Sequence, residues 1–140
     1  MSRSTAEFKL QCAVVKHLDS AFAGKFWFTH VPGQTRDATE AHFNKVLGYK
    51  AGTPDLLILY EGRLHAIELK APDGIVSSAQ NKTLSTMRFN GALTAVCKSV
   101  KEVHNTIVGW GIVTHHDSIV EPDYRNWDQK NKDGQDFFKP

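Results

Sequence analysis

The sequence predicts an α/β domain in which one mixed β-sheet is flanked by helices. Helix-type and strand-type hydrophobic patterns alternate in the order α-β-α-β-β-α-β-α. Glycines and helix-capping residues mark most of the boundaries between these patterns. A length of 140 residues, of which 41% are apolar, suits a single globular domain with a buried core.

The first part of the chain is expected to form two helices with a strand between them. Residues 4–22, STAEFKLQCAVVKHLDSAF, place apolar side chains at helical spacing, and Gly24 ends this helix. Residues 25–31, KFWFTHV, are rich in aromatic and β-branched side chains and are typical of a strand. Residues 35–48, TRDATEAHFNKVLG, predict a second, shorter helix that stops at Gly48.

The next part is expected to contribute three strands and two helices. LLILY and LHAIEL, residues 56–60 and 64–69, are predicted strands. A capping-box pattern from Ser77 to Gln80 begins a helix that ends at Gly91. ALTAVCK is a further strand, and a helix begins near Ser99. The periodicity fades after Thr114, so we expect a domain over residues 1–114 and a polar C-terminal tail over residues 115–140.

Composition limits the classes of function only weakly. No run of 18 or more apolar residues occurs, so no membrane span is expected. Cys12 and Cys97 lack metal-type spacing and are read as buried free thiols of a reducing cytosol. The formal charge is +2, divided into −2 from His115 onward and +4 before it, a mild basic bias compatible with a phosphate-binding face.

The segment GTPDLLILYEGRLHAIELK carries charges at the far ends of two apolar strands. Charges are almost never fully buried unless they are paired or coordinate a metal. If Glu61-Gly62 is a two-residue hairpin turn, counting back along both strands places Asp55 directly across from Glu68, with Cβ atoms about 4.5–5.5 Å apart. Lys70 shares the face of Glu68 because residues two apart in a strand point the same way.

Two carboxylates this close repel each other, and a divalent cation removes the conflict. Hard oxygen donors on a half-open site suit Mg²⁺, which keeps several waters and is often completed by substrate phosphate. Lys70 would lie beside that water shell, where it could hold or help deprotonate an attacking water. The pattern therefore indicates phosphodiester hydrolysis. The alternative is an ordinary solvated strand face, because an E-x-K pattern by itself is common.

The PD…ExK pattern, with HVPGQTR, GYKAGTPDLLIL, HAIELKAPDGIVSSAQ and the leading helix, resembles the PD-(D/E)xK nuclease superfamily. The layout over residues 5–112 is similar to its VRR-NUC (virus-type replication-repair nuclease) family. The resemblance implies a restriction-endonuclease-like fold that hydrolyses DNA with Mg²⁺ or Mn²⁺. It further implies that Asp55, Glu68 and the main-chain carbonyl of Leu69 bind the metal and that Lys70 serves the water. In related families a leading-helix glutamate, here Glu7, is a further ligand, and the glutamine that matches Gln80 lies near the site.

Each additional site residue has a second interpretation. Glu7 and Gln80 each stand three residues after a serine, so helix capping explains either one locally. Arg36, Lys45 and Lys50 could contact DNA phosphates or could simply be solvated charges. His30 is more readily explained as a hydrogen-bonded structural histidine. The run His115-His116-Asp117 is discounted as a metal cluster because adjacent strand residues point to opposite faces.

By this resemblance we expect a metal-dependent endonuclease selective for branched DNA such as Holliday junctions. It is expected to act as a homodimer with one site per strand, in the cytoplasm of a bacterium or a phage-infected host. One alternative is a less selective nuclease module of a restriction or replication system. Another is a non-catalytic nucleic-acid-binding domain of the same fold.

Overall fold

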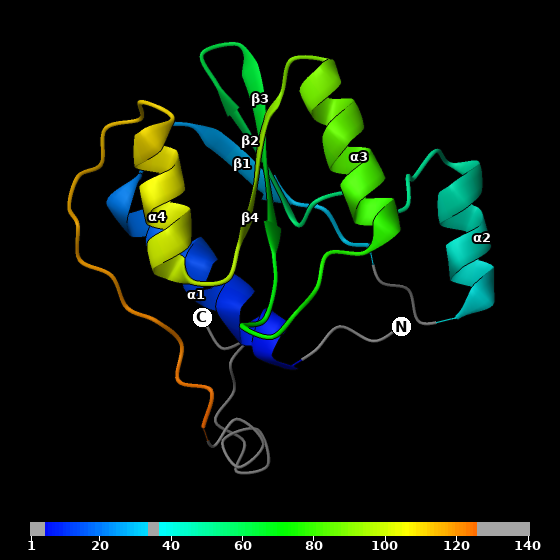
Figure 1. Cartoon of the computed structure of the whole chain (residues 1–140), viewed down its shortest axis with the longest axis horizontal. Helices are drawn as coiled ribbons and strands as arrows, with labels where there is room; N and C mark the ends of the chain where they lie inside the picture. Colours follow the sequence, from blue (N-terminus) through cyan, green and yellow to red (C-terminus); the bar gives the residue numbers. More distant parts are fainter. Residues whose placement is uncertain (1–4, 34–36, 126–140) are drawn as a thin grey trace.

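A computed structural model describes residues 5–33 and 37–125 of the chain. Its elements follow the predicted order (Figure 1). The helices are α1 (Thr5–Ala21), α2 (Ala38–Val46), α3 (Ser78–Phe89) and α4 (Val100–Gly109). The strands are β1 (Trp27–His30), β2 (Leu56–Tyr60), β3 (Arg63–Leu69) and β4 (Leu93–Cys97). The predicted fold class, a mixed sheet flanked by helices, is confirmed.

The four strands form one sheet in the order β1-β2-β3-β4. β1 pairs antiparallel with β2, and β2 pairs antiparallel with β3. β4 lies parallel to β3, which it reaches through the α3 crossover. The β2–β3 turn consists of Glu61 and Gly62 with φ of 47° and 75°, and two positive φ angles in a row are typical of a type I′ hairpin. Tyr60 therefore pairs with Arg63, as the sequence predicts.

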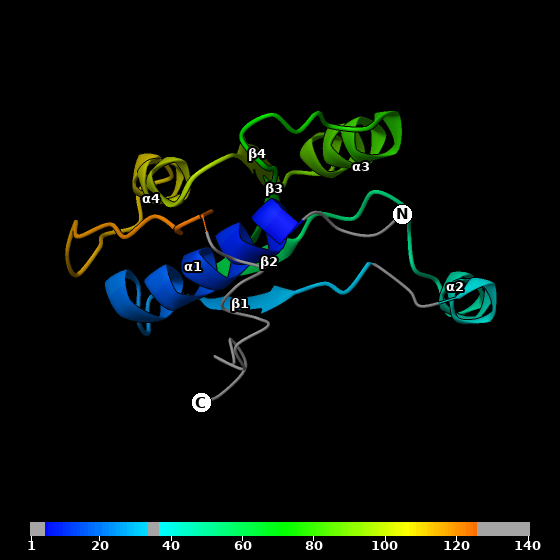
Figure 2. The same ribbon diagram turned by 90° about the horizontal axis from the view of Figure 1, so that it is seen from below.

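The main core lies between one face of the sheet and the helices α1 and α4 (Figure 2). β2 and β3 alternate side chains across the sheet, so Leu56, Ile58 and Ile67 point into this core and are fully buried. α3 lies against the opposite face, where Arg88 Nη1 donates to Thr94 Oγ1 of β4 at 2.8 Å. The acidic residues that flank Leu56 and Ile67 consequently point to the α3 side of the sheet.

The chain that follows α4 is fixed to the body by specific contacts, although the sequence shows no periodicity there. Glu121 Oε1 accepts a hydrogen bond from the backbone N–H of Val100, at the N-terminus of α4, at 2.7 Å. Asp117 Oδ1 lies 2.9 Å from Nε2 of His104. This part of the predicted tail therefore packs along α1 and α4, which the polar composition did not indicate.

Within the described ranges, no helix combines the length and the apolar character needed to cross a membrane.

Candidate active site

The hairpin register brings the two predicted carboxylates together. Leu56 pairs with Ile67, so Asp55 and Glu68 occupy the next opposed position, on the α3 side of the sheet. Asp55 Oδ2 accepts a hydrogen bond from the backbone N–H of Leu69 at 2.8 Å, across the two strands. The structure therefore has the predicted register, in which Asp55 and Glu68 lie opposite each other on neighbouring strands.

Glu68 lies in an environment that disfavours its charge. Only 3% of its surface is exposed. The pKa of Glu68 is raised from 4.5 to about 8, mainly by burial and then by the charge of Asp55 and a hydrogen bond between the two carboxyl groups. The charge of Lys70 opposes this shift. Oε2 of Glu68 is buried and accepts no hydrogen bond from any described residue. A hydrogen bond between two carboxyl groups needs a proton, so the pair holds one proton near neutral pH.

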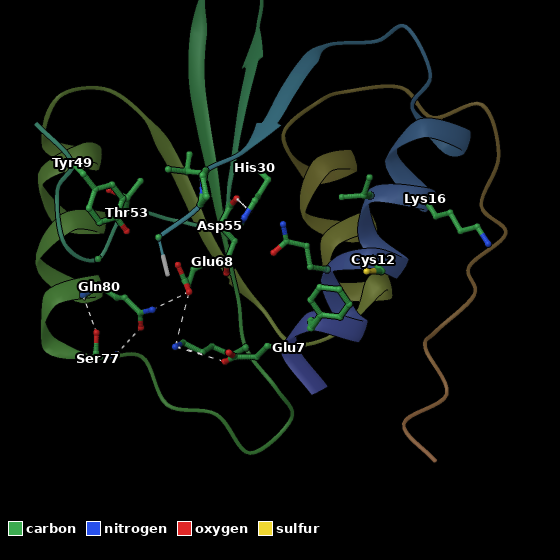
Figure 3. A pocket seen from close by; sticks show the side chains of 18 of the residues that line it. Glu7, Cys12, Lys16, His30, Tyr49, Thr53, Asp55, Glu68, Ser77 and Gln80 are labelled. Atoms are coloured by element: carbon green, nitrogen blue, oxygen red, sulfur yellow. Dashed lines mark hydrogen bonds and ion pairs between the residues drawn. The ribbon is translucent and has the colours of Figure 1, made fainter. Parts of the chain in front are cut away.

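Lys70 connects the carboxylate pair with the first helix. Its Nζ lies 4.0 Å from Oε1 of Glu68 and 3.9 Å from Oε1 of Glu7. The side chains of Lys70 and Glu7 are only 12% and 18% exposed, so this ammonium group is less screened than a surface lysine. The structure thus brings Glu7, from a distant part of the sequence, to the site, where it faces Lys70 (Figure 3).

Gln80 combines the two roles that the sequence left as alternatives. Oε1 of Gln80 accepts a hydrogen bond from the backbone N–H of Ser77, and the backbone N–H of Gln80 donates to Ser77 Oγ. These two bonds complete the capping box of α3. Its Nε2 donates to Glu68 Oε1 at 3.0 Å. Because the cap fixes the amide group, Gln80 at the N-terminus of α3 holds Oε1 of Glu68 in place (Figure 3).

The site opens into a groove of about 840 Å³ between α1, the end of β1, the loop before β2 and the start of α3. Glu7, Asp55, Glu68, Lys70 and Gln80 all line it. Figure 3 shows Gln80 on the α3 side of Glu68 and Glu7 on the α1 side. The groove is partly open to solvent and is lined by both polar and apolar groups.

The loop before β2 contributes features that the sequence did not identify. Gly52 has φ of +79°, and a Cβ there would meet the carbonyl oxygen of Ala79 at 2.4 Å, so the loop backbone lies directly on α3. A Cβ on Gly33 would meet the hydroxyl oxygen of Tyr49 at 2.3 Å. Burial, followed by the charges of Glu68 and Asp55, raises the pKa of Tyr49. No periodicity in the sequence indicates these close approaches, because they join segments far apart in the chain.

Of the three basic residues predicted to contact DNA, the structure describes two, and neither lines the groove. Lys45 and Lys50 are exposed and lie outside the residues that line the groove, and Arg36 falls outside the described residues. Lys16 of α1 lines the groove instead. Nδ1 of His30 lies 2.9 Å from the carbonyl oxygen of Asp55, as expected for a structural histidine, although His30 also borders the groove.

The donor set fits a magnesium-type ion better than a closed metal centre. Residues 5–33 and 37–125 contain no group of three or more His, Cys, Asp and Glu side chains arranged to hold a metal. Mg²⁺ needs only one or two carboxylates, because waters and substrate phosphates complete its shell. Oε2 of Glu68 is buried beside Asp55 and accepts no hydrogen bond from the described residues, so it is the kind of oxygen that such an ion requires. The ligand roles of Glu7 and of the Leu69 carbonyl stay predictions.

Comparisons with known proteins give a consistent result. The VRR-NUC domain matches residues 25–101, which is more than half of the chain. A solved structure described as "VRR_NUC domain protein" is 24% identical, and the match covers 78% of this chain and 90% of that one with a TM-score of 0.63. This structural similarity supports the fold assignment. No curated protein matches the chain. The chain belongs to the VRR-NUC family, a family of nucleases that act on DNA.

Proposed function

We propose that this protein is an Mg²⁺- or Mn²⁺-dependent endodeoxyribonuclease that hydrolyses phosphodiester bonds in the groove between α1 and α3. The observation that carries the proposal is the opposed pair Asp55 and Glu68, in which Oε2 of Glu68 is buried and accepts no hydrogen bond from the described residues. A buried carboxyl group with a pKa of about 8 is costly to ionise, and a divalent cation beside it offsets that cost.

The residues of the site divide the work of hydrolysis. Asp55 and Glu68 would hold the metal, and Gln80 orients Glu68 through its hydrogen bond. The bound ion would supply Lewis acidity, which activates a water and neutralises phosphate charge. Lys70 lies close enough to the carboxylate pair to orient that water and to stabilise the charge that develops on the phosphate. In-line attack would leave a 5′-phosphate and a 3′-hydroxyl.

The finer proposal is selectivity for branched DNA, such as a four-way junction, cut by a homodimer with one site per strand. An open groove in place of a closed pocket supports a polymeric substrate. A less selective nuclease module is the second candidate, favoured by the modest formal charge of +2. A third candidate is a non-catalytic DNA-binding domain, and the retention of Asp55, Glu68 and Lys70 together counts against it.

A cleavage panel tests the proposal. Four-way junctions, flaps and linear duplexes are incubated with the purified protein in Mg²⁺, in Mn²⁺ and in EDTA. We expect metal-dependent cutting, with symmetric nicks in the junction. Equal cutting of linear duplex would favour the less selective nuclease, and binding without cutting under every metal would favour the non-catalytic domain.

A further inference from the structure

Two buried side-chain oxygen atoms have no hydrogen-bond partner among the residues that the structure describes, and both belong to residues that line the groove. They are Oε1 of Gln11 and Oε2 of Glu68. A buried polar atom without a partner lowers stability, because it has lost water and gained nothing in exchange. Such an atom in a folded protein calls for an explanation, for example an ion or a water that binds there. The proposed metal explains the oxygen of Glu68, whereas the oxygen of Gln11 has no role so far.

Gln11 lies on the α1 wall of the groove, and only 8% of its surface is exposed. It follows Glu7 by four residues, so the two side chains are neighbours on one face of the helix, with Cβ atoms about 5–6 Å apart. Figure 3 shows Glu7 on the α1 side of Glu68. Oε1 of Glu7 lies 3.9 Å from Nζ of Lys70, which in turn lies 4.0 Å from Oε1 of Glu68. Gln11 is therefore one helical turn away from the charged groups of the site.

The structure of α1 itself does not explain a buried glutamine at this position. Gln11 lies in the middle of α1, where backbone groups bond to one another within the helix and need no side-chain cap. Leu10 and Val14 already supply the buried apolar side chains of this part of the helix. An apolar side chain at position 11 would fill the same space without burying an oxygen that has no partner. The glutamine thus costs stability that its local surroundings do not return.

The chemistry of the two oxygen atoms limits what can satisfy them. An amide oxygen and an ionised carboxylate oxygen are acceptors, so each needs a hydrogen-bond donor or a cation. A DNA phosphate offers only acceptor oxygens and satisfies neither atom. The ammonium group of Lys70 lies in the same groove but donates to neither of them. A divalent cation with its water shell meets both needs, because the ion binds the carboxylate and its waters donate hydrogen bonds.

We propose that Gln11 is a positioning residue of the metal site, and that its Oε1 accepts a hydrogen bond from a water of the ion that Asp55 and Glu68 hold. The inference rests on the proposed function for the ion and extends it by giving Gln11 a task. Gln80 holds Oε1 of Glu68 from the α3 side, and Gln11 would orient the water shell from the α1 side. Two amide groups would then fix the site from its two walls.

Metal binding in the absence of DNA tests the inference. Mn²⁺ is titrated into the parent protein and its variants, and free Mn²⁺ is read from its paramagnetic resonance signal. Gln11→Met keeps the length of the side chain but removes the acceptor, so we expect Mn²⁺ binding to weaken about tenfold or more. Gln11→Glu keeps an acceptor and should bind Mn²⁺ at least as tightly as the parent. Asn105→Met, at an exposed position of α4, is the matched control and should bind like the parent.

Thermal unfolding supplies a second readout, which a purely structural role would not produce. In EDTA, Gln11→Met should have a higher Tm than the parent, because it removes a buried acceptor that has no donor. Saturating Mn²⁺ should raise the Tm of the parent more than the Tm of Gln11→Met, because tighter binding to the folded state stabilises it more. If Gln11 only packed against its neighbours, the difference in Tm between the two proteins would be the same in EDTA and in Mn²⁺.

The outcomes separate this inference from the proposed function. Gln11→Met with the Mn²⁺ affinity of the parent overturns the inference, and so does an equal loss of affinity in Gln11→Glu. Circular dichroism shows whether Gln11→Met folds, and Gln11→Leu replaces it, with the same expectations, if it does not. Mn²⁺ binding that depends on Gln11 in a protein that never cuts DNA refutes only the proposed function. Metal-dependent cutting with an Mn²⁺ affinity that is independent of Gln11 refutes only this inference.

Discussion

Replacing Glu68 by glutamine should stabilise the metal-free protein at high pH, by an amount that grows with pH. The folded protein holds a proton on Glu68 up to a pKa of about 8, whereas the unfolded chain releases it near 4.5. Between these values the folded state binds more protons than the unfolded state, so stability falls as pH rises. Glutamine does not titrate, and the variant lacks this loss.

The magnitude follows from the shift. Each pKa unit corresponds to about 1.36 kcal/mol, so a shift from 4.5 to about 8 amounts to roughly 5 kcal/mol between pH 4 and pH 9. About 3 kcal/mol of this is already lost at pH 7. Glutamine also keeps the oxygen that accepts from Gln80, and its amide N–H can donate to Asp55 in place of the carboxyl proton, so the shape of the site is retained.

The assay is urea unfolding in EDTA from pH 4 to pH 9 for the parent and Glu68→Gln. We expect the difference in the free energy of unfolding to rise by several kcal/mol in favour of the variant across this range. Titrating groups remote from Glu68 cancel because only the difference between the two proteins is compared. A difference that stays constant with pH would refute the assignment of a buried, protonated Glu68.

Three further predictions concern the metal, the lysine and the loop before β2. Asp55→Asn should lower Mg²⁺ affinity by about tenfold or more. It should leave the thermal stability of the metal-free protein unchanged or raise it, because the substitution removes carboxylate repulsion. Titration calorimetry that finds full Mg²⁺ affinity contradicts the ligand role. Lys70→Ala should lower kcat by roughly 100-fold or more and leave DNA binding intact, with the exposed Lys101→Ala as its control; unchanged cutting removes the lysine from the mechanism. Gly52→Ala should lower the free energy of unfolding by about 2–3 kcal/mol or more, because its Cβ would meet the α3 backbone. The control Gly62→Ala, whose Cβ would have nothing within 4 Å, should lower it by only about 1–2 kcal/mol. Equal losses in urea unfolding would show that the close approach is absent.

The centre of the site was predictable because its geometry is local in sequence. Glu61 and Gly62 set a two-residue turn, the turn sets the register, and the register opposes Asp55 and Glu68. The period of two along a strand then places Lys70 on the face of Glu68. The capping box at Ser77 was equally visible, since it needs only the spacing of two residues at the start of a helix.

Other parts of the site depend on packing between distant segments, which spacing along the chain does not encode. That Glu7 faces Lys70 depends on how α1 crosses the sheet, and that Gln80 both caps α3 and holds Glu68 depends on where α3 begins over β3. Gly33 and Tyr49 meet only in the folded state.

The sequence by itself determined the order of elements, the turn and the pair of opposed acids, because hydrophobic period, turn chemistry and strand alternation act over a few residues. Only the tertiary structure decided which oxygen of Glu68 is buried without a hydrogen-bond donor among the described residues, how far burial shifts its pKa, and that no side chain of α2 is buried among the described residues. Those properties arise from what surrounds a side chain in space, and the surroundings come from segments brought together by folding.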